Sequence, residues 1–306
     1  MLQTNGNAKV KSISVIIPVY NEKDNVRELY TELKEVLSYN YAELIFIDDG
    51  SSDGTDAVLR ELKQNDDNVH VIKFNRHLGK SEALSSGFKY ASGDYVITMD
   101  GDLQDDPKEI PDFLNEIEKG NDMVVGWKFI RKDPITKRIP SKIFNRLTAF
   151  LTGVKIHDFN CCFKIYKKEV VKNLRIYGEL HRYIPALAYW KGYNVGEMKI
   201  NHRPRKHGKT KYGAMRLVTG FLDLITIKFI MSYAKRPFHL FGFAGLSLTG
   251  IGFISGVYLL YAKYVLNELI GGRPLLFLTM LLVFLGIQLF SIGIIGEILI
   301  SKNGTD

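Results

Sequence analysis

Acidic side chains follow two short apolar segments in the first third of the chain. Asp100 and Asp102 follow one of these segments, and Asp49 follows the other. Carboxylates suit Mg²⁺ or Mn²⁺, which take oxygen ligands and complete their coordination shells with substrate phosphates. A lone Asp-x-Asp pair is a weak signal, because acidic turns are common. Here Gln104 stands at the next alternate position and a second acidic pair ends a neighbouring segment, so the pattern predicts a divalent metal site.

Apolar, β-branched segments alternate with amphipathic segments over the part of the chain that carries these motifs. Strands are predicted at 12–19, 44–47, 69–74, 95–99 and 123–125, with helices from the N-cap candidate Asp24 to residue 37 and at 53–62, 81–90 and 107–117. This alternation implies an α/β fold with a mostly parallel sheet and helices on both faces. Ligands bind at the carboxyl ends of strands in such sheets. Tyr20, Asp49 and Asp102 all fall at such ends, which predicts that they share one site.

The alternation is looser beyond residue 128. We expect a helix at 139–151, a strand at 163–166 followed by a short helix, and a strand at 194–201. The last of these strands leads into a basic loop at 202–212. Together with the preceding elements, this defines a predicted catalytic domain at 1–212.

Two uncharged apolar runs close the chain, at 238–262 and 274–296. Each exceeds the roughly 20 residues that a helix needs to cross a bilayer core. The preceding segment, 215–233, mixes apolar and charged residues and predicts an interfacial amphipathic helix, with an ordinary packing helix as the alternative. We therefore expect an interfacial region at 213–236 and a two-span membrane domain at 237–306. Basic residues outside the two spans predict that the catalytic domain and the C-terminus lie in the cytoplasm.

The 306-residue chain is basic, with a net charge of +8 and a pI of about 9.2. Nucleic acid, anionic lipid or phosphorylated substrates would each explain this charge. The apolar helices favour the last two, so no nucleic-acid partner is expected. The two cysteines, Cys161 and Cys162, are adjacent and form no disulfide framework, which indicates a reducing compartment. The polar N-terminus predicts no cleaved signal peptide.

Three motifs in order resemble those of family 2 inverting glycosyltransferases with the GT-A fold. They are Val-Ile-Ile-Pro-Val-Tyr-Asn-Glu at 15–22, Asp-Asp-Gly-Ser-Ser-Asp-Gly-Thr at 48–55 and Met-Asp-Gly-Asp-Leu-Gln-Asp at 99–105. The whole chain, including the two spans, is similar to the polyprenyl-phosphate glycosyltransferases, which include dolichyl-phosphate mannose synthases and bacterial undecaprenyl-phosphate glucosyltransferases. The resemblance implies transfer of a sugar from a nucleotide sugar to undecaprenyl or dolichyl phosphate at the cytoplasmic face. A UDP-glucose type of donor is favoured over GDP-mannose, and relatives of this shape can be tetrameric.

The resemblance also assigns residues to the donor site. Asp49 would accept a hydrogen bond from the base, and an aromatic side chain at a strand end can stack on that base. Mg²⁺ or Mn²⁺ would neutralise charge on the leaving nucleoside diphosphate. The residues expected to line the nucleotide pocket are Pro18, Tyr20 and Glu22, and those expected to hold the metal are Asp100, Asp102 and Gln104. An acid that favours a helix start is an equal alternative for Glu22.

Cations are expected on the acceptor side, because a lipid monophosphate is mostly dianionic near neutral pH, with a second pKa of about 6. Such a phosphate is already a nucleophile and needs no strong general base. The candidates are Lys128, Arg131, Lys164, Arg205, Lys209 and Lys211. Lysines at 128 and 164 stand where the family has arginines, and they lack bidentate phosphate geometry. The segment 205–212 resembles the family's acceptor loop, and a basic stripe facing lipid headgroups is the rival interpretation.

Asp158 matches an acidic position of the family and is a candidate base or an organiser of Lys164. A loop-capping Asp is the alternative. Two other functions compete with a lipid-phosphate transferase. A processive polysaccharide synthase would carry a Gln-x-x-Arg-Trp motif, and 187–190 reads Leu-Ala-Tyr-Trp instead. A non-catalytic membrane adaptor with the same fold is disfavoured by the intact Asp49, Asp100 and Asp102.

Overall fold

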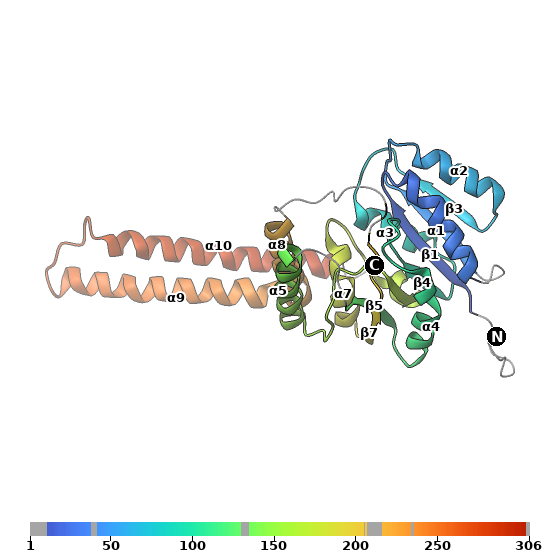
Figure 1. Ribbon diagram of the computed structural model, residues 1–306. Helices are drawn as coiled ribbons and strands as arrows, with labels where there is room; N and C mark the ends of the chain where they lie inside the picture. The colour runs from blue at the N-terminus through green and yellow to red at the C-terminus, as the bar shows by residue number, and fades with distance from the viewer. Residues whose placement is uncertain are drawn as a thin grey trace. The chain divides into compact units, whose positions relative to one another are not determined.

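The computed structural model describes residues 11–37, 42–129, 135–204, 206, 216–233 and 236–303 (Figure 1). The chain forms two compact units, Met1–Ile227 and Lys228–Asp306. The boundary falls within helix α8 (Arg216–Tyr233). The division into three parts at residues 212 and 236 stays a prediction.

A seven-stranded sheet forms the centre of the first unit, in the order β3-β2-β1-β4-β6-β5-β7. The strands are β1 (Ile13–Val19), β2 (Ala42–Asp48), β3 (Val69–Lys73), β4 (Tyr95–Thr98), β5 (Met123–Lys128), β6 (Lys164–Lys167) and β7 (Val195–Ile200). Strand β6 pairs antiparallel with β4 and β5, and the other strand pairs are parallel. The mostly parallel α/β sheet is therefore confirmed. Because β6 runs in the opposite direction, its first residues lie at the edge where the other strands end.

Helices of the first unit follow the strands that they connect. They are α1 (Lys23–Val36), α2 (Thr55–Asn65), α3 (Lys80–Tyr90), η2 (Pro107–Glu109), α4 (Ile110–Glu118), α5 (Ile135–Thr152), α6 (Lys168–Asn173), η3 (Leu180–Tyr183) and α7 (Ile184–Trp190), and the unit ends within α8. Helix α3 packs on β1 and β2, and α4 packs on β5, β6 and β7. The sequence analysis missed the helical segment formed by η3 and α7.

The start of α1 differs from its prediction. Asp24 lies in the first turn, and Glu22 occupies the N-cap position. The reason lies in a distant turn: the amide of Lys23 donates to Asp53 Oδ2 at 3.1 Å, and the amide of Glu22 donates to Thr55 Oγ1 at 3.0 Å. The acidic turn after β2 therefore satisfies amides that a local N-cap would otherwise bind.

The core of the first unit is built on β1 and β2, which are buried on both faces, as expected for strands in a parallel sheet covered by helices. Gly87 of α3 lies against these strands. A Cβ at this position would lie 2.5 Å from Ile16 Cγ2, which is closer than packed carbon atoms approach. The glycine therefore sets how closely α3 can pack on the sheet and, with it, the position of the residues at the start of that helix.

The second unit contains helices α9 (Pro237–Tyr264) and α10 (Pro274–Asn303), which run side by side in Figure 1. Both are long and apolar enough to cross a bilayer, with mean hydropathy 1.7 and 2.5. A Cβ at Gly245 would lie 2.6 Å from the carbonyl oxygen of Gly286, so small residues allow the two backbones to approach. Glu297 Oε2 accepts the backbone N–H of Phe238 at 3.3 Å.

Candidate active site

The candidate residues gather at one edge of the sheet. Tyr20 follows β1, Asp49 follows β2, and Asp100 and Asp102 follow β4. Strands β2, β1 and β4 are parallel neighbours, so their carboxyl ends lie side by side. Strand β5 ends at this edge, and the antiparallel β6 begins there. Three further candidates occupy these strands: Pro18 in β1, Lys128 at the end of β5 and Lys164 at the start of β6.

Asp49 is held by the segment that follows β3. Its carboxylate accepts the backbone N–H groups of Leu78 at 2.7 Å and Gly79 at 3.0 Å. The ring of His77 lies with Nδ1 2.8 Å from Asp49 Oδ2, and it stacks on Tyr20 with ring centroids 4.3 Å apart. Asp49 and the two aromatic rings therefore form one oriented group at the ends of β1 and β2.

The turn after β2 is closed against the turn after β1. Asp48 Oδ1 accepts the amide of Ser51 at 2.8 Å, and Ser51 Oγ accepts the amide of Asn21 at 2.9 Å. Gly50 has φ +76°, and a Cβ there would lie 2.5 Å from the carbonyl carbon of Arg76. Only glycine fits this backbone conformation and this close approach. The segment that binds Asp49 can therefore lie directly against the turn.

Glu22 contacts the first turn of α1 in the structure. Its Oε2 accepts the side-chain N–H of Asn25 at 2.6 Å. This contact agrees with the alternative interpretation of Glu22 as a residue of the helix start. Its role in a nucleotide pocket, like that of Pro18, stays a prediction.

Asp100 forms an ion pair with a residue that the sequence analysis did not single out. Lys80, the first residue of α3, places Nζ 2.5 Å from Asp100 Oδ1. Burial alone would raise the pKa of Asp100, but the ammonium groups of Lys80 and Lys128 outweigh burial and hold this pKa below its ordinary value. Asp100 is therefore an ionised oxygen donor at neutral pH. The signal for Lys80 in the sequence was a Gly-Lys pair after an apolar strand and before a helix.

Asp102 is buried, with 7 % of its surface exposed, and its Oδ1 accepts the amide of Gln104 at 3.2 Å. Among the residues that the structure describes, no group of three or more His, Cys, Asp or Glu side chains forms a metal site. Mg²⁺ is often bound by only one or two protein carboxylates, with the remaining ligands from substrate phosphates and water. The pair formed by Asp100 and Asp102 fits a metal held in this way.

Gln104 joins the acidic motif to the segment after β7. The side-chain Nε2 of Gln104 lies 3.2 Å from His202 Nε2. The backbone carbonyl oxygen of Gln104 accepts the amide N–H of Arg203 at 3.0 Å. Arg203 itself forms ion pairs at 2.7 Å with Glu32 and Asp106. These contacts fix the segment after β7 beside the motif. Metal ligation by Gln104 stays a prediction.

Lys128 forms a buried ion pair. Its Nζ lies 2.9 Å from Asp105 Oδ1, and the two side chains are 14 % and 0 % exposed. Burial would lower the pKa of Lys128, but the carboxylate of Asp105 outweighs burial and raises it above its ordinary value. The sequence analysis proposed Lys128 as an acceptor cation and did not identify Asp105. In the structure, Lys128 is the counter-ion of the buried carboxylate of Asp105, which follows the motif of Asp100 and Asp102 in the sequence.

Lys164 and Asp158 are both buried. The ammonium of Lys164 donates to the carbonyl oxygen of Cys161, and burial lowers the pKa of this lysine. Asp158 Oδ1 accepts the amide of Asn160 at 3.1 Å, the geometry of a side chain that caps its own turn. The alternative interpretation of Asp158 as a loop cap matches this contact, and its role as a base stays a prediction. Burial raises the pKa of Cys162 to about 12, which agrees with a packing role.

Four proposed acceptor cations, Arg131, Arg205, Lys209 and Lys211, lie outside the described residues. The sequence analysis also missed His181, which lies near the site. His181 Nδ1 lies 3.0 Å from the hydroxyl of Ser81, the residue after Lys80. Burial, followed by the positive charge of Lys80, lowers the pKa of His181 well below its ordinary value.

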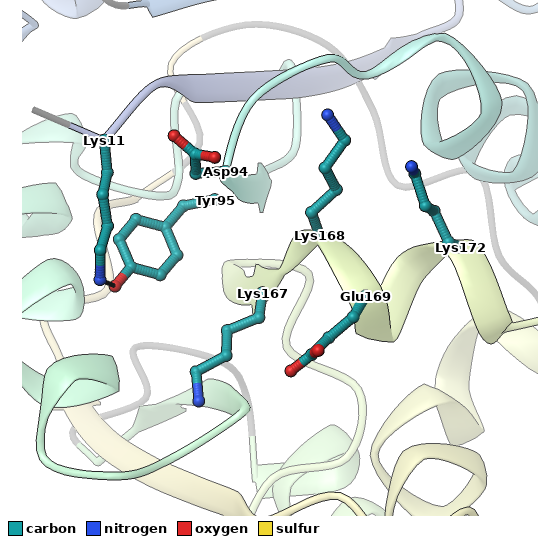
Figure 2. A pocket seen from close by; sticks show the side chains of 7 residues that line it. All are labelled: Lys11, Asp94, Tyr95, Lys167, Lys168, Glu169 and Lys172. Atoms are coloured by element: carbon teal, nitrogen blue, oxygen red, sulfur yellow. Dashed lines mark hydrogen bonds between the residues drawn. The ribbon is translucent and has the colours of Figure 1, made fainter. Parts of the chain in front are cut away.

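A lysine-rich cavity of about 620 Å³ lies at the opposite edge of the sheet, where β1 and β4 begin and β6 ends (Figure 2). Figure 2 shows the ammonium of Lys11 at the hydroxyl of Tyr95, 2.5 Å away. Lys167, on another wall, lies 2.6 Å from Asp122. The cavity is separated from the acidic motifs by the length of the strands, so it is no part of the candidate site.

Known proteins match this chain over most of its length. Residues 14–175 match the model of "Glycosyl transferase family 2". The chain is 36% identical over 303 residues to the dodecaprenyl-phosphate galacturonate synthase of Rhizobium johnstonii, covering 97% of this chain and 90% of the relative. It is 32% identical over 298 residues to the undecaprenyl-phosphate 4-deoxy-4-formamido-L-arabinose transferase of Shewanella sediminis, covering 95% and 88%.

Solved structures share the fold at lower identity. A glucosyl-3-phosphoglycerate synthase from Mycobacterium tuberculosis, solved with Mn²⁺, UDP and glucosyl-3-phosphoglycerate, superposes with a TM-score of 0.57 at 18% identity. The match covers 72% of this chain and 80% of that chain. The same enzyme solved with Mg²⁺ and UDP gives a TM-score of 0.55 at 18% identity, covering 70% and 79%. At this identity the likeness shows the fold of the head alone.

Proposed function

The chain is a glycosyltransferase of family 2, and on this premise we propose that it transfers a sugar from a nucleotide sugar to polyprenyl phosphate. One observation carries the proposal. Asp49 and the pair of Asp100 and Asp102 lie at the same edge of the sheet, at the ends of β2 and β4 on either side of β1, in a chain that matches polyprenyl-phosphate sugar transferases along nearly its whole length. The apolar α9 and α10 would anchor the enzyme in the bilayer that contains such an acceptor.

The donor site would be formed by the ends of β1, β2 and β4. Asp49 would accept a hydrogen bond from the base, and Tyr20 would stack on it. Asp100 and Asp102 would hold Mg²⁺ or Mn²⁺ against the diphosphate. When bound, this ion supplies positive charge that stabilises the leaving nucleoside diphosphate. The depressed pKa of Asp100 supports this role, because it keeps the carboxylate ionised.

Transfer would proceed with inversion at the anomeric carbon. A phosphate oxygen of the acceptor forms the new C–O bond as the bond from that carbon to the diphosphate breaks. The acceptor phosphate is largely a dianion at neutral pH, so the step requires no proton removal. This is consistent with the buried, turn-capping geometry of Asp158. Arg131, Arg205, Lys209 and Lys211 are the proposed acceptor-binding cations.

A donor screen identifies the sugar and its nucleotide. The two relatives compared above are a dodecaprenyl-phosphate galacturonate synthase and an undecaprenyl-phosphate 4-deoxy-4-formamido-L-arabinose transferase. We propose a UDP sugar, and the donor screen should include uronates and amino sugars besides UDP-glucose and GDP-mannose. We also propose that the head and the C-terminus face the cytoplasm and that the chain forms homo-oligomers.

Incubation of the purified full-length chain with radiolabelled nucleotide sugars and polyprenyl phosphate, with and without EDTA, tests the proposal. We expect label in the organic phase only when divalent metal is present. Label in a polymer would indicate a polysaccharide synthase, and absence of label with every donor would indicate a non-catalytic adaptor. Label that persists in EDTA would contradict the metal assignment.

A further inference from the structure

The side-chain amide of Gln288 lies in the middle of α10. Gln288 is at the midpoint of the apolar segment Pro274–Lys302, which is long enough to cross a bilayer. Its side chain is exposed, and none of the residues that the structure describes forms a hydrogen bond with it. An amide without a hydrogen-bond partner is costly in hydrocarbon. The position of Gln288 therefore indicates that a polar group of another molecule covers it.

Two other polar side chains of the same segment are satisfied within the chain. Thr279 and Ser291 each donate a hydroxyl hydrogen bond to the carbonyl oxygen four residues earlier, at 2.8 and 2.9 Å. A hydroxyl can satisfy its single donor on its own helix in this way. A glutamine amide carries two N–H groups and a carbonyl oxygen, so it needs partners on a neighbouring helix.

Gln288 points away from α9, the neighbouring helix within the chain. A Cβ at Gly245 of α9 would lie 2.6 Å from the carbonyl oxygen of Gly286 and 2.7 Å from the amide nitrogen of Phe290. With about 3.6 residues per turn, positions two residues before and two residues after Gln288 lie on the opposite side of α10. Because α9 occupies that opposite side, it does not supply the partner of Gln288.

Gln288 belongs to a stripe of exposed residues along α10. The Gln288 stripe consists of Phe277, Leu281, Phe284, Gln288, Ser291 and Ile295. Steps of four and three residues alternate along it, which is the heptad spacing of helices that pack in parallel, left-handed pairs. A polar residue within such a stripe fixes the register of the pair. Ser291 is small and lies one turn from Gln288, so it allows two backbones to approach.

We propose that the Gln288 stripe is the contact surface with a second copy of this chain. Both copies insert in the same orientation, so their α10 helices run parallel and their Gln288 side chains lie at the same depth. The amide is self-complementary, because its N–H groups donate and its carbonyl oxygen accepts. Two copies related by a two-fold axis along the bilayer normal can therefore form reciprocal hydrogen bonds. The inference rests on the homo-oligomer of the proposed function and names the surface that forms it.

Fluorescence energy transfer between copies tests the inference. The full-length chain is labelled at its N-terminus and reconstituted in phosphatidylcholine vesicles at rising ratios of protein to lipid. The wild type should associate, and Gln288→Leu should associate roughly 3- to 30-fold more weakly, because it removes the interhelical hydrogen bonds. Gln288→Asn keeps the amide and should associate more tightly than Gln288→Leu.

Matched variants show whether the position on the helix matters. Phe284→Ala removes a side chain of the stripe, and Phe253→Ala removes a side chain of α9 with nearly the same exposure, 70% against 69%. Only Phe284→Ala should weaken association. Ser247→Leu removes an exposed hydroxyl from α9 and should leave association unchanged.

The inference is wrong if Gln288→Leu and Phe284→Ala associate as tightly as the wild type. In that case, loss of copurifying polyprenyl phosphate from Gln288→Leu would identify lipid as the occupant of the stripe. Absence of energy transfer in the wild type at every ratio would overturn both this surface and the proposed homo-oligomer. The radiolabel assay tests sugar transfer separately, so failure of the surface and failure of the proposed reaction are distinguishable.

Discussion

The rings of Tyr20 and His77 are stacked at an interplanar angle of 25°, and His77 also contacts Asp49. This relationship joins residues from the segments that follow β1, β2 and β3 at one corner of the site. Binding of a planar nucleotide base requires an aromatic ring that stacks on the base beside a carboxylate that accepts a hydrogen bond from it. The stack therefore gives the nucleoside part of the proposal a specific residue to test.

Replacing Tyr20 should weaken nucleotide binding. Stacking of a base on an aromatic side chain contributes roughly 1–3 kcal/mol, so Tyr20→Ala should raise the Kd for UDP by roughly 5- to 150-fold. Tyr20→Phe keeps the ring and should stay within about twofold of the wild type. Calorimetric titration of the purified chain measures both. Equal affinities for the alanine variant and the wild type would show that the base binds elsewhere.

Asp102→Ala should abolish transfer and leave membrane insertion intact. The loss of an electrostatic contact to the transition state typically lowers the rate by roughly 100-fold or more. Asp112→Ala, at an exposed position of α4, is the matched control and should retain activity. Transfer to polyprenyl phosphate and recovery in the membrane fraction are the two measurements. Activity retained by Asp102→Ala would refute its role as a metal ligand.

Lys128→Met should destabilise the first unit of the chain. The substitution leaves the carboxylate of Asp105 buried without its counter-ion, which typically costs roughly 3–5 kcal/mol. Adding Asp105→Asn removes that charge and should restore most of the unfolding midpoint. Thermal unfolding of the single and double variants measures the effect. Equal midpoints for the single variant and the wild type would show that the pair contributes little.

The same variants separate stability from acceptor binding. If Lys128 also contacts the lipid phosphate, the stable double variant should keep a raised KM for polyprenyl phosphate. A wild-type KM in the double variant would assign Lys128 to the buried ion pair alone.

Stability should fall as the pH falls below about 6.5, in part because of His181. Burial, followed by the charges of Lys80 and Arg182, lowers the pKa of His181 well below 6.5. The unfolded chain therefore binds a proton at His181 at a higher pH than the folded chain does. Stabilisation by neutral His181 is present above about pH 6.5 and is lost as the pH drops toward the folded-state pKa.

Unfolding midpoints measured between about pH 7.5 and 5 test this expectation. The curve of His181→Gln should be flatter than that of the wild type over this interval. Parallel curves would show that His181 does not contribute to the pH dependence.

Gly50→Ala should weaken nucleotide binding through the backbone. The added Cβ would press on the backbone of Arg76 and move the adjacent segment His77–Lys80 away from Asp49. Gly120→Ala is the matched control, because Gly120 also has a positive φ (+102°) but has no atom within 4 Å of an added Cβ. Both variants should lose roughly 1 kcal/mol of stability from backbone strain. Only Gly50→Ala should raise the Kd for UDP, and equal effects of both variants would contradict this explanation.

Much of the architecture could be predicted from the sequence. The predicted strands at 12–19 and 44–47 correspond to β1 and β2, and the apolar runs at 238–262 and 274–296 lie within α9 and α10. These predictions succeed because hydrophobic periodicity and run length are local properties of the chain. The position of Asp49 and Asp102 at one edge of the sheet could also be predicted from the sequence, because the carboxyl ends of parallel strands lie at the same edge.

The ion pairs around these motifs were decided only by the tertiary structure. Lys80 contacts Asp100 and Lys128 contacts Asp105 because β4 lies between β1 and β6, and no local pattern specifies which strands are neighbours. The same applies to α1, whose first amides bind Asp53 and Thr55 and not Asp24. The sequence determined which side chains stand at the strand ends through short-range periodicity. The fold decided which of them meet, because a charge takes its partner from whatever long-range packing brings within reach.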